Sequence, residues 1–472
     1  MSKKESSGSV VVIGGGPGGY PAAFYAADKG MNVTLVDTDV NPGGVCLYRG
    51  CIPSKALHHA ARVINETREA ADMGLAFNKP RISVKKLREW KDSVVERLTG
   101  GVGQLSKMRK VNYIQGHAEF NDSNSITIKK KNGKSETIKF EHAIISTGSR
   151  PAIIPNIPEN SKRILDSTTA LDIDSVPKSL LVIGGGYIGL ELGTVYSALG
   201  SKVTVIEMLE GLLPGADRDL VRPLAKRLGK EFESILLKAK VTEVKEQKNG
   251  MKVSYTDSDG EKHSKVFDKV LVAVGRKPNT DDVGLHNTKV KVNDKGFIEV
   301  DGQRRTAESH IFAIGDVAGE PMLAHKATHE ALVAVEAIEG KKTVFEPMAI
   351  PAVVFTDPEV AWSGLTEEEA KKTNKKVKVL RFPWAASGRA ITFERDEGVT
   401  KLVTDPKSGR ILGVGITGVN AGELIAEGTL AIEMGATAED LALTIHAHPT
   451  LSETLMEAGE MMHGNAVHAI RK

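Results

Sequence analysis

The chain contains the same nucleotide-binding pattern twice, and this duplication constrains the fold more than any other feature of the sequence. In the first copy, the apolar run at residues 10–13 leads into a glycine-rich turn, small residues follow at helical spacing, and a second apolar run ends in Asp37. In the second copy, residues 180–183 lead into a similar turn, and the next apolar run ends in Glu207. In both copies the acid lies 23 residues after the first glycine of the turn. Each copy predicts a strand, a tight turn, a helix and a second strand.

The glycines of such a turn let backbone amides approach a pyrophosphate at a helix N-terminus, and the acid binds ribose hydroxyls. A reading with one functional and one decayed copy is disfavoured, because both copies keep their acid and all of their glycines. The glycines expected at the two pyrophosphates are Gly14, Gly16 and Gly19, and then Gly184, Gly186 and Gly189. Two intact sites predict two dinucleotides, an arrangement suited to passing electrons between them.

The second site favours NAD over NADP. Glu207 would repel the 2′-phosphate of NADP, and the neighbouring Met208 and Leu209 offer no positive charge to attract it.

The only two cysteines of the chain, Cys46 and Cys51, lie five residues apart between glycines. A disulfide closing so short a loop contributes only ~2 kcal/mol on the chain-entropy estimate. Five residues along a regular helix rise ~7.5 Å, which is more than a disulfide usually spans. The pair therefore predicts an irregular loop entering a helix, and dithiol–disulfide chemistry. Pro53 and Ser54 suit the first turn of that helix, whose N-terminus, together with Lys55, favours a thiolate at Cys51.

Two other readings of the cysteines remain open. They could be reduced and inert, or they could bind a metal with His58 and His59. Adjacent histidines point to different sides of a helix, which disfavours the metal site.

A flavin is the natural intermediary between a nicotinamide, which delivers a hydride, and a disulfide, which exchanges with thiols. The apolar run at 311–316 ends in Gly-Asp, and residues 322–325 follow at a helix start. Asp316 is therefore placed to bind ribityl hydroxyls, while the turns at 146–149 and 273–276 are typical of crossings back from the two nucleotide units.

A histidine pair near the end of the chain supplies a candidate base. His446 and His448 precede a proline, and Glu453 follows five residues after His448. A carboxylate that holds a histidine fixes its tautomer and raises its basicity, as activation of a thiol requires.

Length and composition predict a globular protein of three or four domains. The 472 residues are 40% apolar and 26% charged, and the net charge of +3 gives no argument for nucleic acid. The basic run at 129–131 is interpreted as a solvated hairpin end. No apolar stretch is long enough to span a membrane, and the first residues lack a signal-peptide core, so we expect a cytoplasmic protein without membrane contact.

Taken together, these motifs resemble the pyridine nucleotide–disulfide oxidoreductase family, with a match that runs from about Ser9 to about Glu460. The resemblance implies an α/β fold with two Rossmann-like dinucleotide-binding domains, one for FAD and one for NAD, and a C-terminal α+β dimerisation domain. The implied domains are an FAD-binding domain with the redox-active disulfide (1–150), an NAD-binding domain (151–279), a central domain that completes the FAD site (280–349) and an interface domain (350–472).

The resemblance also implies roles for individual residues. Cys46 would exchange with the substrate, Cys51 would lie next to the flavin, and His448, oriented by Glu453, would act as base from the other subunit of a homodimer. Lys55 would contact the flavin and pair with Glu191. The full set of expected FAD contacts is Gly14, Gly16, Gly19, Asp37, Gly44, Val45, Lys55, Ala118, Thr147, Gly148, Asp316, Met322, Leu323, Ala324 and His325. The set of expected NAD contacts is Gly184, Gly186, Tyr187, Gly189, Glu191, Glu207, Val241 and Gly275.

Within the family, the motifs are most similar to those of the branch that oxidises protein-bound dihydrolipoamide with NAD⁺. Its partners would be the lipoyl domains and acyltransferase core of 2-oxoacid dehydrogenase complexes, or a glycine cleavage system. Three features depart from that branch: Asp37 replaces glutamate, Tyr48-Arg49 replaces Asn-Val, and Tyr187 is typical of glutathione reductases. Two alternatives therefore stay open, a reductase of another, glutathione-like disulfide and a docking subunit that uses the acidic residues 367–369.

Overall fold

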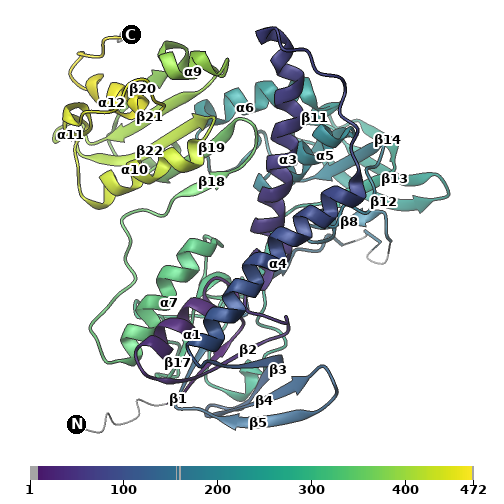
Figure 1. Ribbon diagram of the computed structural model, residues 1–472, viewed down its shortest axis with the longest axis vertical. Coiled ribbons are helices and arrows are strands. Elements are labelled where there is room, and N and C mark those ends of the chain that lie inside the picture. Colours follow the sequence, from purple (N-terminus) through teal and green to yellow (C-terminus); the bar gives the residue numbers. More distant parts are fainter. Residues whose placement is uncertain (1–8, 156, 159–160, 470–472) are drawn as a thin grey trace. The chain divides into compact units, whose positions relative to one another are not determined.

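The computed structural model of the chain describes residues 9–155, 157–158 and 161–469 (Figure 1). The chain forms two compact units, each assembled from separate stretches of sequence. The first unit comprises residues 1–56, 83–152 and 275–346, and the second comprises 57–82, 153–274 and 347–472. The division into the four expected domains stays a prediction.

The first unit is built on a seven-stranded sheet whose strand order is β17-β6-β1-β2-β3-β4-β5. The strands from β17 to β3 run parallel, and β4 and β5 continue the sheet as antiparallel hairpins. The basic run at 129–131 comprises the last two residues of β4 and the first residue of the turn to β5. The strands are β1 (Ser9–Ile13), β2 (Asn32–Asp37), β3 (Asn112–Asp122), β4 (Ser125–Lys130), β5 (Ser135–Lys139), β6 (His142–Ile145) and β17 (Ile311–Ala313).

Alternate residues of β1 face opposite sides of this sheet, as the pleat of a strand requires. Val10 and Val12 pack in a buried cluster with α1 (Gly19–Asp28) and α7 (Ala324–Ile338), which lie side by side (Figure 1). Val11 and Ile13 belong to a second cluster on the opposite face. Because alanines line the buried face of α1, the helix approaches the sheet closely and its N-terminus reaches the end of β1.

The remaining elements of the first unit surround the ends of these strands. The predicted turns 146–149 and 273–276 lead into two short strands, β7 and β16, which pair with each other in antiparallel orientation. The predicted strand over 311–316 ends earlier, at Ala313, because Gly315 has φ +74° and opens a 3₁₀ turn. These elements are α2 (Gly44–Arg49), α4 (Val84–Met108), β7 (Ser149–Pro151), β16 (Arg276–Pro278), η3 (Leu285–Asn287) and η4 (Gly315–Ala318). Helix α3 (Cys51–Glu69) begins in this unit and is followed by η1 (Ala70–Met73).

The second unit contains a five-stranded parallel sheet in the order β11-β10-β9-β15-β8 and a three-stranded antiparallel sheet. Strands β9 and β10 with helix α5 repeat the arrangement of β1, β2 and α1. The elements are β8 (Ile164–Leu165), η2 (Thr169–Leu171), β9 (Ser179–Ile183), α5 (Tyr187–Leu199), β10 (Lys202–Ile206), α6 (Arg218–Glu231), β11 (Ser234–Leu236), β12 (Lys240–Gln247), β13 (Gly250–Thr256), β14 (Lys262–Phe267) and β15 (Lys269–Val272).

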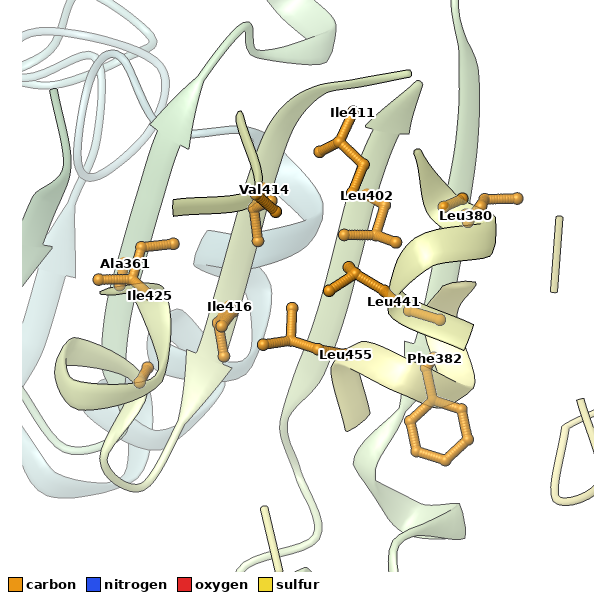
Figure 2. Close-up of a cluster of buried hydrophobic side chains, with 14 of the residues drawn as sticks. Ala361, Leu380, Phe382, Leu402, Ile411, Val414, Ile416, Ile425, Leu441 and Leu455 are labelled. Carbon is orange, nitrogen blue, oxygen red and sulfur yellow. The ribbon is translucent and has the colours of Figure 1, made fainter. Parts of the chain in front are cut away.

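The C-terminal part of the second unit packs helices on a five-stranded antiparallel sheet, in the order β18-β19-β22-β21-β20. Its core joins Leu402 and Ile416 of the sheet with Leu455 of α12, all fully or nearly fully buried (Figure 2). This packing fixes the N-terminus of α12, where Glu453 lies. The elements are β18 (Ala352–Val354), β19 (Glu359–Gly364), α8 (Glu367–Lys372), β20 (Lys378–Pro383), η5 (Trp384–Ala386), α9 (Gly388–Thr392), β21 (Val399–Thr404), β22 (Ile411–Gly418), α10 (Ala421–Glu433), α11 (Ala438–Leu443) and α12 (Glu453–Glu460).

The expected α/β fold, with two parallel nucleotide-binding sheets and a C-terminal α+β part, is confirmed. Among the described residues, no helix combines the length and the apolar character needed to cross a bilayer.

Candidate functional site

The first glycine turn packs its own backbone so closely that only glycine fits at two of its positions. A Cβ atom on Gly14 would lie 2.2 Å from the carbonyl oxygen of Ser146, and one on Gly19 would lie 1.7 Å from that of Gly14. Above Gly16 the space is open, since the nearest atom to a Cβ there is the Cα of Gly44 at 4.0 Å. A turn that is closed against the protein and open at its middle glycine fits a bound pyrophosphate.

Asp37, the last residue of β2, holds the same turn. Its Oδ2 accepts the N–H of Gly15, and its Oδ1 accepts the N–H of Asp39 at 2.9 Å. Burial raises the pKa of Asp37, while these backbone hydrogen bonds oppose the shift.

The second glycine turn repeats the arrangement in detail. Glu207 Oε2 accepts the N–H of Gly185 at 2.6 Å, and its Oε1 accepts the N–H of Leu209 at 2.7 Å. A Cβ on Gly189 would lie 2.2 Å from the carbonyl oxygen of Gly184, whereas one on Gly186 would meet nothing within 4 Å. Each unit therefore presents a cradle with the shape and the acidic residue that a dinucleotide requires.

The two cysteines lie at the junction of two helices. Cys46 is the third residue of α2, and Cys51 is the first residue of α3. The prediction of an irregular loop between the cysteines is wrong, because the backbone is helical on both sides of Gly50. Only Gly50 departs from the helical conformation, at φ −145° and ψ −112°. One residue outside the helical conformation is enough to change the direction of the chain between the two cysteines.

The cysteines are in the dithiol form, with Cys46 partly buried and Cys51 exposed. A hydrogen bond between the two side chains, together with burial, raises the pKa of the Cys46 thiol. Both effects favour the protonated form of the Cys46 thiol. Two thiols in hydrogen-bond contact are placed as dithiol–disulfide exchange requires.

Asp316 is held by contacts that the sequence pattern did not indicate. Ser149 Oγ donates to Asp316 Oδ2 at 2.5 Å, and Arg276 Nε donates to Ser149 Oγ at 2.7 Å. The preceding peptide is fixed by the fully buried Glu330, whose Oε2 accepts the N–H of Gly315 at 2.6 Å. Glu330 is in turn paired with two cations, Arg304 and Lys326, each at 3.0 Å.

The other expected FAD contacts lie in three different settings. Thr147 Oγ1 donates to the carbonyl of Asn279 at 2.7 Å, and Gly148 accepts the N–H of Asn279 at 2.9 Å, so their turn is fixed by a residue that sequence reasoning missed. The side chain of Ala118 is instead buried in the core of the first unit. Residues near the start of a helix are Gly44 and Val45 in α2, Lys55 in α3, and Met322, Leu323, Ala324 and His325 around the first turn of α7.

The expected NAD contacts also differ in their surroundings. Tyr187 begins α5 and is 42% exposed, and Gly275, at φ +121°, accepts the N–H of Ala152 at 3.0 Å. Val241 packs against the core beneath the antiparallel sheet. Buried Glu191 accepts the N–H of Phe355 at 3.0 Å and lies 3.7 Å from His58 Nε2. Its pairing with Lys55 stays a prediction.

The structure distinguishes between the two C-terminal histidines. The side chain of His446 is 6% exposed and uses both ring nitrogens, with Nε2 2.7 Å from Glu427 and Nδ1 2.8 Å from the carbonyl of Thr444. His448 is 77% exposed, and its Nδ1 lies 2.9 Å from Glu453 Oε1. A carboxylate on Nδ1 places the proton there and leaves Nε2 as the basic nitrogen. The contact that the sequence allowed between His448 and Glu453 is therefore present.

Glu453 is well suited to remain ionised. Burial raises its pKa, but the N–H of Thr450, at 2.7 Å from Oε2, and the bond with His448 outweigh burial, so the pKa of Glu453 is lowered.

The acidic residues 367–369 are engaged within the chain. Glu367 pairs with the buried Lys401 at 3.0 Å, Glu368 with Lys372 at 2.8 Å, and Glu369 forms a capping box with Thr366. These contacts describe a stabilised helix start rather than an unpaired acidic surface.

Within residues 9–155, 157–158 and 161–469, no group of three His, Cys, Asp or Glu side chains has an arrangement able to hold a metal ion. The features with chemical significance in these residues are two nucleotide cradles, a dithiol, and a histidine held by a carboxylate. Together with the fold, these features define a nucleotide-dependent dithiol–disulfide oxidoreductase.

Comparison with known proteins gives the family. The profile described as pyridine nucleotide-disulphide oxidoreductase matches residues 8–331, and the dimerisation domain of the same family matches residues 350–459. The chain belongs to the pyridine nucleotide-disulphide oxidoreductase family and contains its dimerisation domain.

The curated relatives match nearly the whole chain. The dihydrolipoyl dehydrogenase of Haemophilus influenzae is 49% identical, covering 98% of this chain and 96% of the relative. The dihydrolipoyl dehydrogenase of Vibrio parahaemolyticus is 48% identical, covering 98% and 97%. Among solved structures, LpdA of Mycobacterium tuberculosis has a TM-score of 0.89 at 26% identity, covering 96% of this chain and 99% of that chain. RclA of Escherichia coli, an HOCl-induced flavoprotein disulfide reductase, has a TM-score of 0.85 at 28% identity, covering 96% and 99%.

Proposed function

We propose that the protein acts as a dihydrolipoyl dehydrogenase, which oxidises protein-bound dihydrolipoamide to lipoamide and reduces NAD⁺. The observation that carries this proposal is the dithiol at the α2–α3 junction, in the same unit as the Asp37 nucleotide cradle. The curated relatives of nearly equal length support the choice of substrate.

The first cradle would hold FAD through the glycine turn, Asp37 and Asp316, and the second would hold NAD through its glycine turn and Glu207. FAD supplies a redox centre that takes an electron pair from a dithiol and passes a hydride to NAD⁺. The protein contributes the binding, the orientation and the thiol chemistry.

In the oxidised enzyme a disulfide joins Cys46 and Cys51. A thiolate of dihydrolipoamide attacks Cys46 Sγ, a bond forms between these sulfurs, the bond between the cysteines breaks, and Cys51 leaves as a thiolate. The second substrate thiolate then attacks its own sulfur partner, which closes the lipoamide disulfide and releases Cys46. The basic Nε2 of His448 accepts the substrate proton, and ionised Glu453 stabilises the resulting imidazolium.

We further propose that the protein works as a homodimer in which the histidine dyad serves the dithiol of the other subunit. Apolar side chains on the C-terminal part support this, because Leu430, Met434, Leu443 and Ile445 are 61%, 76%, 75% and 96% exposed. Such a surface calls for a partner. Lipoyl domains and the acyltransferase core of 2-oxoacid dehydrogenase complexes, in the cytoplasm, are the expected further partners.

The test is an anaerobic titration of the purified holoenzyme with dihydrolipoamide, followed by NAD⁺, with the visible spectrum recorded throughout. We expect a flavin spectrum that dihydrolipoamide alters, and NADH that appears when NAD⁺ is added. A flavin that ignores dihydrolipoamide but responds to NADPH would contradict the proposal and support a reductase of a different disulfide. Binding to an acyltransferase core without any turnover would support a docking subunit.

The choice of NAD predicts the effect of reversing the charge at Glu207. We expect Glu207→Arg to shift the ratio of kcat/KM for NADH over NADPH toward NADPH by about 100-fold, because it removes a repulsion and adds an attraction for the 2′-phosphate. Glu207→Gln removes only the charge and should give a smaller shift. The assignment is wrong if both variants keep the wild-type ratio.

A further inference from the structure

Two of the four residues between the cysteines, Tyr48 and Arg49, are bonded to the segment that follows Asp37. Arg49 donates to both carboxylate oxygens of Asp39, from Nη1 to Oδ1 at 2.9 Å and from Nη2 to Oδ2 at 3.0 Å. The hydroxyl of Tyr48 lies 3.1 Å from the N–H of Asn41 and 3.2 Å from its carbonyl oxygen. These hydrogen bonds connect helix α2, which contains Cys46, to the segment that follows Asp37.

Asp39 is fixed from several directions at once. Its own N–H donates to Asp37 Oδ1 at 2.9 Å, and its carbonyl accepts the hydroxyl of Tyr113 at 2.7 Å. Its side chain is 17% exposed and that of Arg49 is 36% exposed. A planar guanidinium on a carboxylate is the most directional ion pair available, so Arg49 sets the orientation of Asp39 and with it the N–H that Asp37 accepts.

The rest of the segment is closed against the glycine turn. The N–H of Gly43 donates to the carbonyl of Gly15 at 2.7 Å. Asn41 lies against Gly103 of α4, where a Cβ would be 2.3 Å from Asn41 Oδ1. A displacement of residues 38–43 therefore moves the cradle as well.

The positive charge of Arg49 also offsets the negative charges of Asp37 and Asp39. Asp37 and Asp39 are two carboxylates two residues apart, and Asp39 raises the pKa of Asp37 whereas Arg49 lowers it, both weakly beside burial. Without Arg49, the uncompensated charge of Asp39 would act against Asp37 and against any bound phosphate.

Among its described residues, the second nucleotide unit has no equivalent of the Arg49–Asp39 link between a nucleotide turn and a cysteine helix. There the segment after Glu207 is also held by an arginine, Arg218, which donates to the carbonyls of Leu212 and Leu213 at 2.7 Å each. Arg218 belongs to α6 of the nucleotide unit itself. In the first unit the corresponding arginine belongs instead to the helix that contains Cys46.

We propose that Arg49 and Tyr48 are positioning residues that hold the adenosine half of FAD from the dithiol helix, by orienting Asp39 and through it Asp37. The proposal rests on the proposed function for the identity of the nucleotide. It also gives a role to the Tyr48-Arg49 pair, which departs from the Asn-Val usual in the family branch. The bonds of Arg49 and Tyr48 run to Asp39 and Asn41, in the segment that follows Asp37, so we expect their effect on nucleotide binding.

The test is a double-mutant cycle on the full-length holoenzyme, with FAD release on dilution followed by the increase in flavin fluorescence. We expect Arg49→Met and Asp39→Asn each to raise the dissociation constant of FAD about tenfold, and the double variant to show about the same tenfold rather than a hundredfold increase. Arg49→Lys should restore part of the affinity, and Tyr48→Phe should cost about threefold.

Two further measurements separate positioning from a general loss of structure. ADP contains the adenosine half alone, so the ratio of ADP to FAD affinities, obtained by displacement, should stay at the wild-type value in every variant. The KM for NADH, which binds in the other cradle, should also stay unchanged. Arg109→Ala serves as matched control, because Arg109 forms a similar ion pair with Asp28, at 3.0 Å, at the opposite end of α1.

The outcomes are distinguishable. Unchanged FAD affinity in the Arg49 and Asp39 variants, or effects that multiply in the double variant, would overturn the inference while leaving the proposed function intact. Equal loss in Arg109→Ala would also overturn it. A wild-type protein that contains no FAD would contradict the proposed function itself.

Discussion

Replacing Cys46 with serine should lower dihydrolipoamide turnover by about a thousandfold or more and leave FAD bound. A hydroxyl of the same shape neither forms the bond to the substrate sulfur nor closes a disulfide with Cys51. The hydrogen bond that raises the pKa of Cys46 shows that its sulfur lies next to that of Cys51, as exchange between the two requires. Turnover is measured by NADH formation from dihydrolipoamide, and bound FAD by its absorbance after gel filtration.

A dye that takes electrons directly from the flavin provides the control. Its reduction by NADH requires both nucleotides but no thiol, so Cys46→Ser should keep this activity near the wild-type level. Dihydrolipoamide turnover above about a tenth of the wild-type value would contradict the assigned role of Cys46. Loss of both activities would show damage to the nucleotide sites instead.

The two nucleotide cradles could be predicted from the sequence because their parts are close in sequence and repeat at a fixed spacing. A strand, a tight turn and a helix leave little choice for the acid that ends the next strand. Asp37 and Glu207 accordingly accept the N–H groups of Gly15 and Gly185 in the same way.

Contacts between distant segments could not be predicted. Ser149 and Asp316 are 167 residues apart, and only the packing of β6 between β1 and β17 brings their turns together. The same holds for Glu330, a residue that looks like an ordinary surface acid in a helical sequence but is fully buried beneath Gly315. Arg49 departs from the family branch in the sequence itself, yet its partner Asp39 is apparent only in the folded chain.

The histidine motif could be predicted only in part. The spacing to Glu453 and the resemblance to the family favoured His448 as the base, but neither showed what His446 contacts. The choice follows from burial and bonding, because Glu427 and Thr444 occupy both nitrogens of His446.

The same geometry predicts the second large effect. We expect His448→Gln to lower kcat for dihydrolipoamide oxidation by about 100- to 10,000-fold, because glutamine keeps a polar side chain but has no basic nitrogen to take the substrate proton. Glu453→Gln should cost less, because it leaves the base in place and removes only the charge that fixes its tautomer and stabilises the imidazolium. Stopped-flow reduction of the enzyme by dihydrolipoamide measures the affected step directly.

The pH profile separates a base from a structural histidine. The lowered pKa of Glu453 keeps its carboxylate ionised below the usual range of a glutamate, so the acidic limb of kcat in the wild type reports the histidine and not its partner. That limb should disappear in His448→Gln and persist in His446→Gln, the matched control, whose nitrogens are already engaged. An acidic limb that survives in His448→Gln, or an equal loss of rate in His446→Gln, would assign the base to another residue, since only a nitrogen that is free to exchange protons can give the wild-type profile.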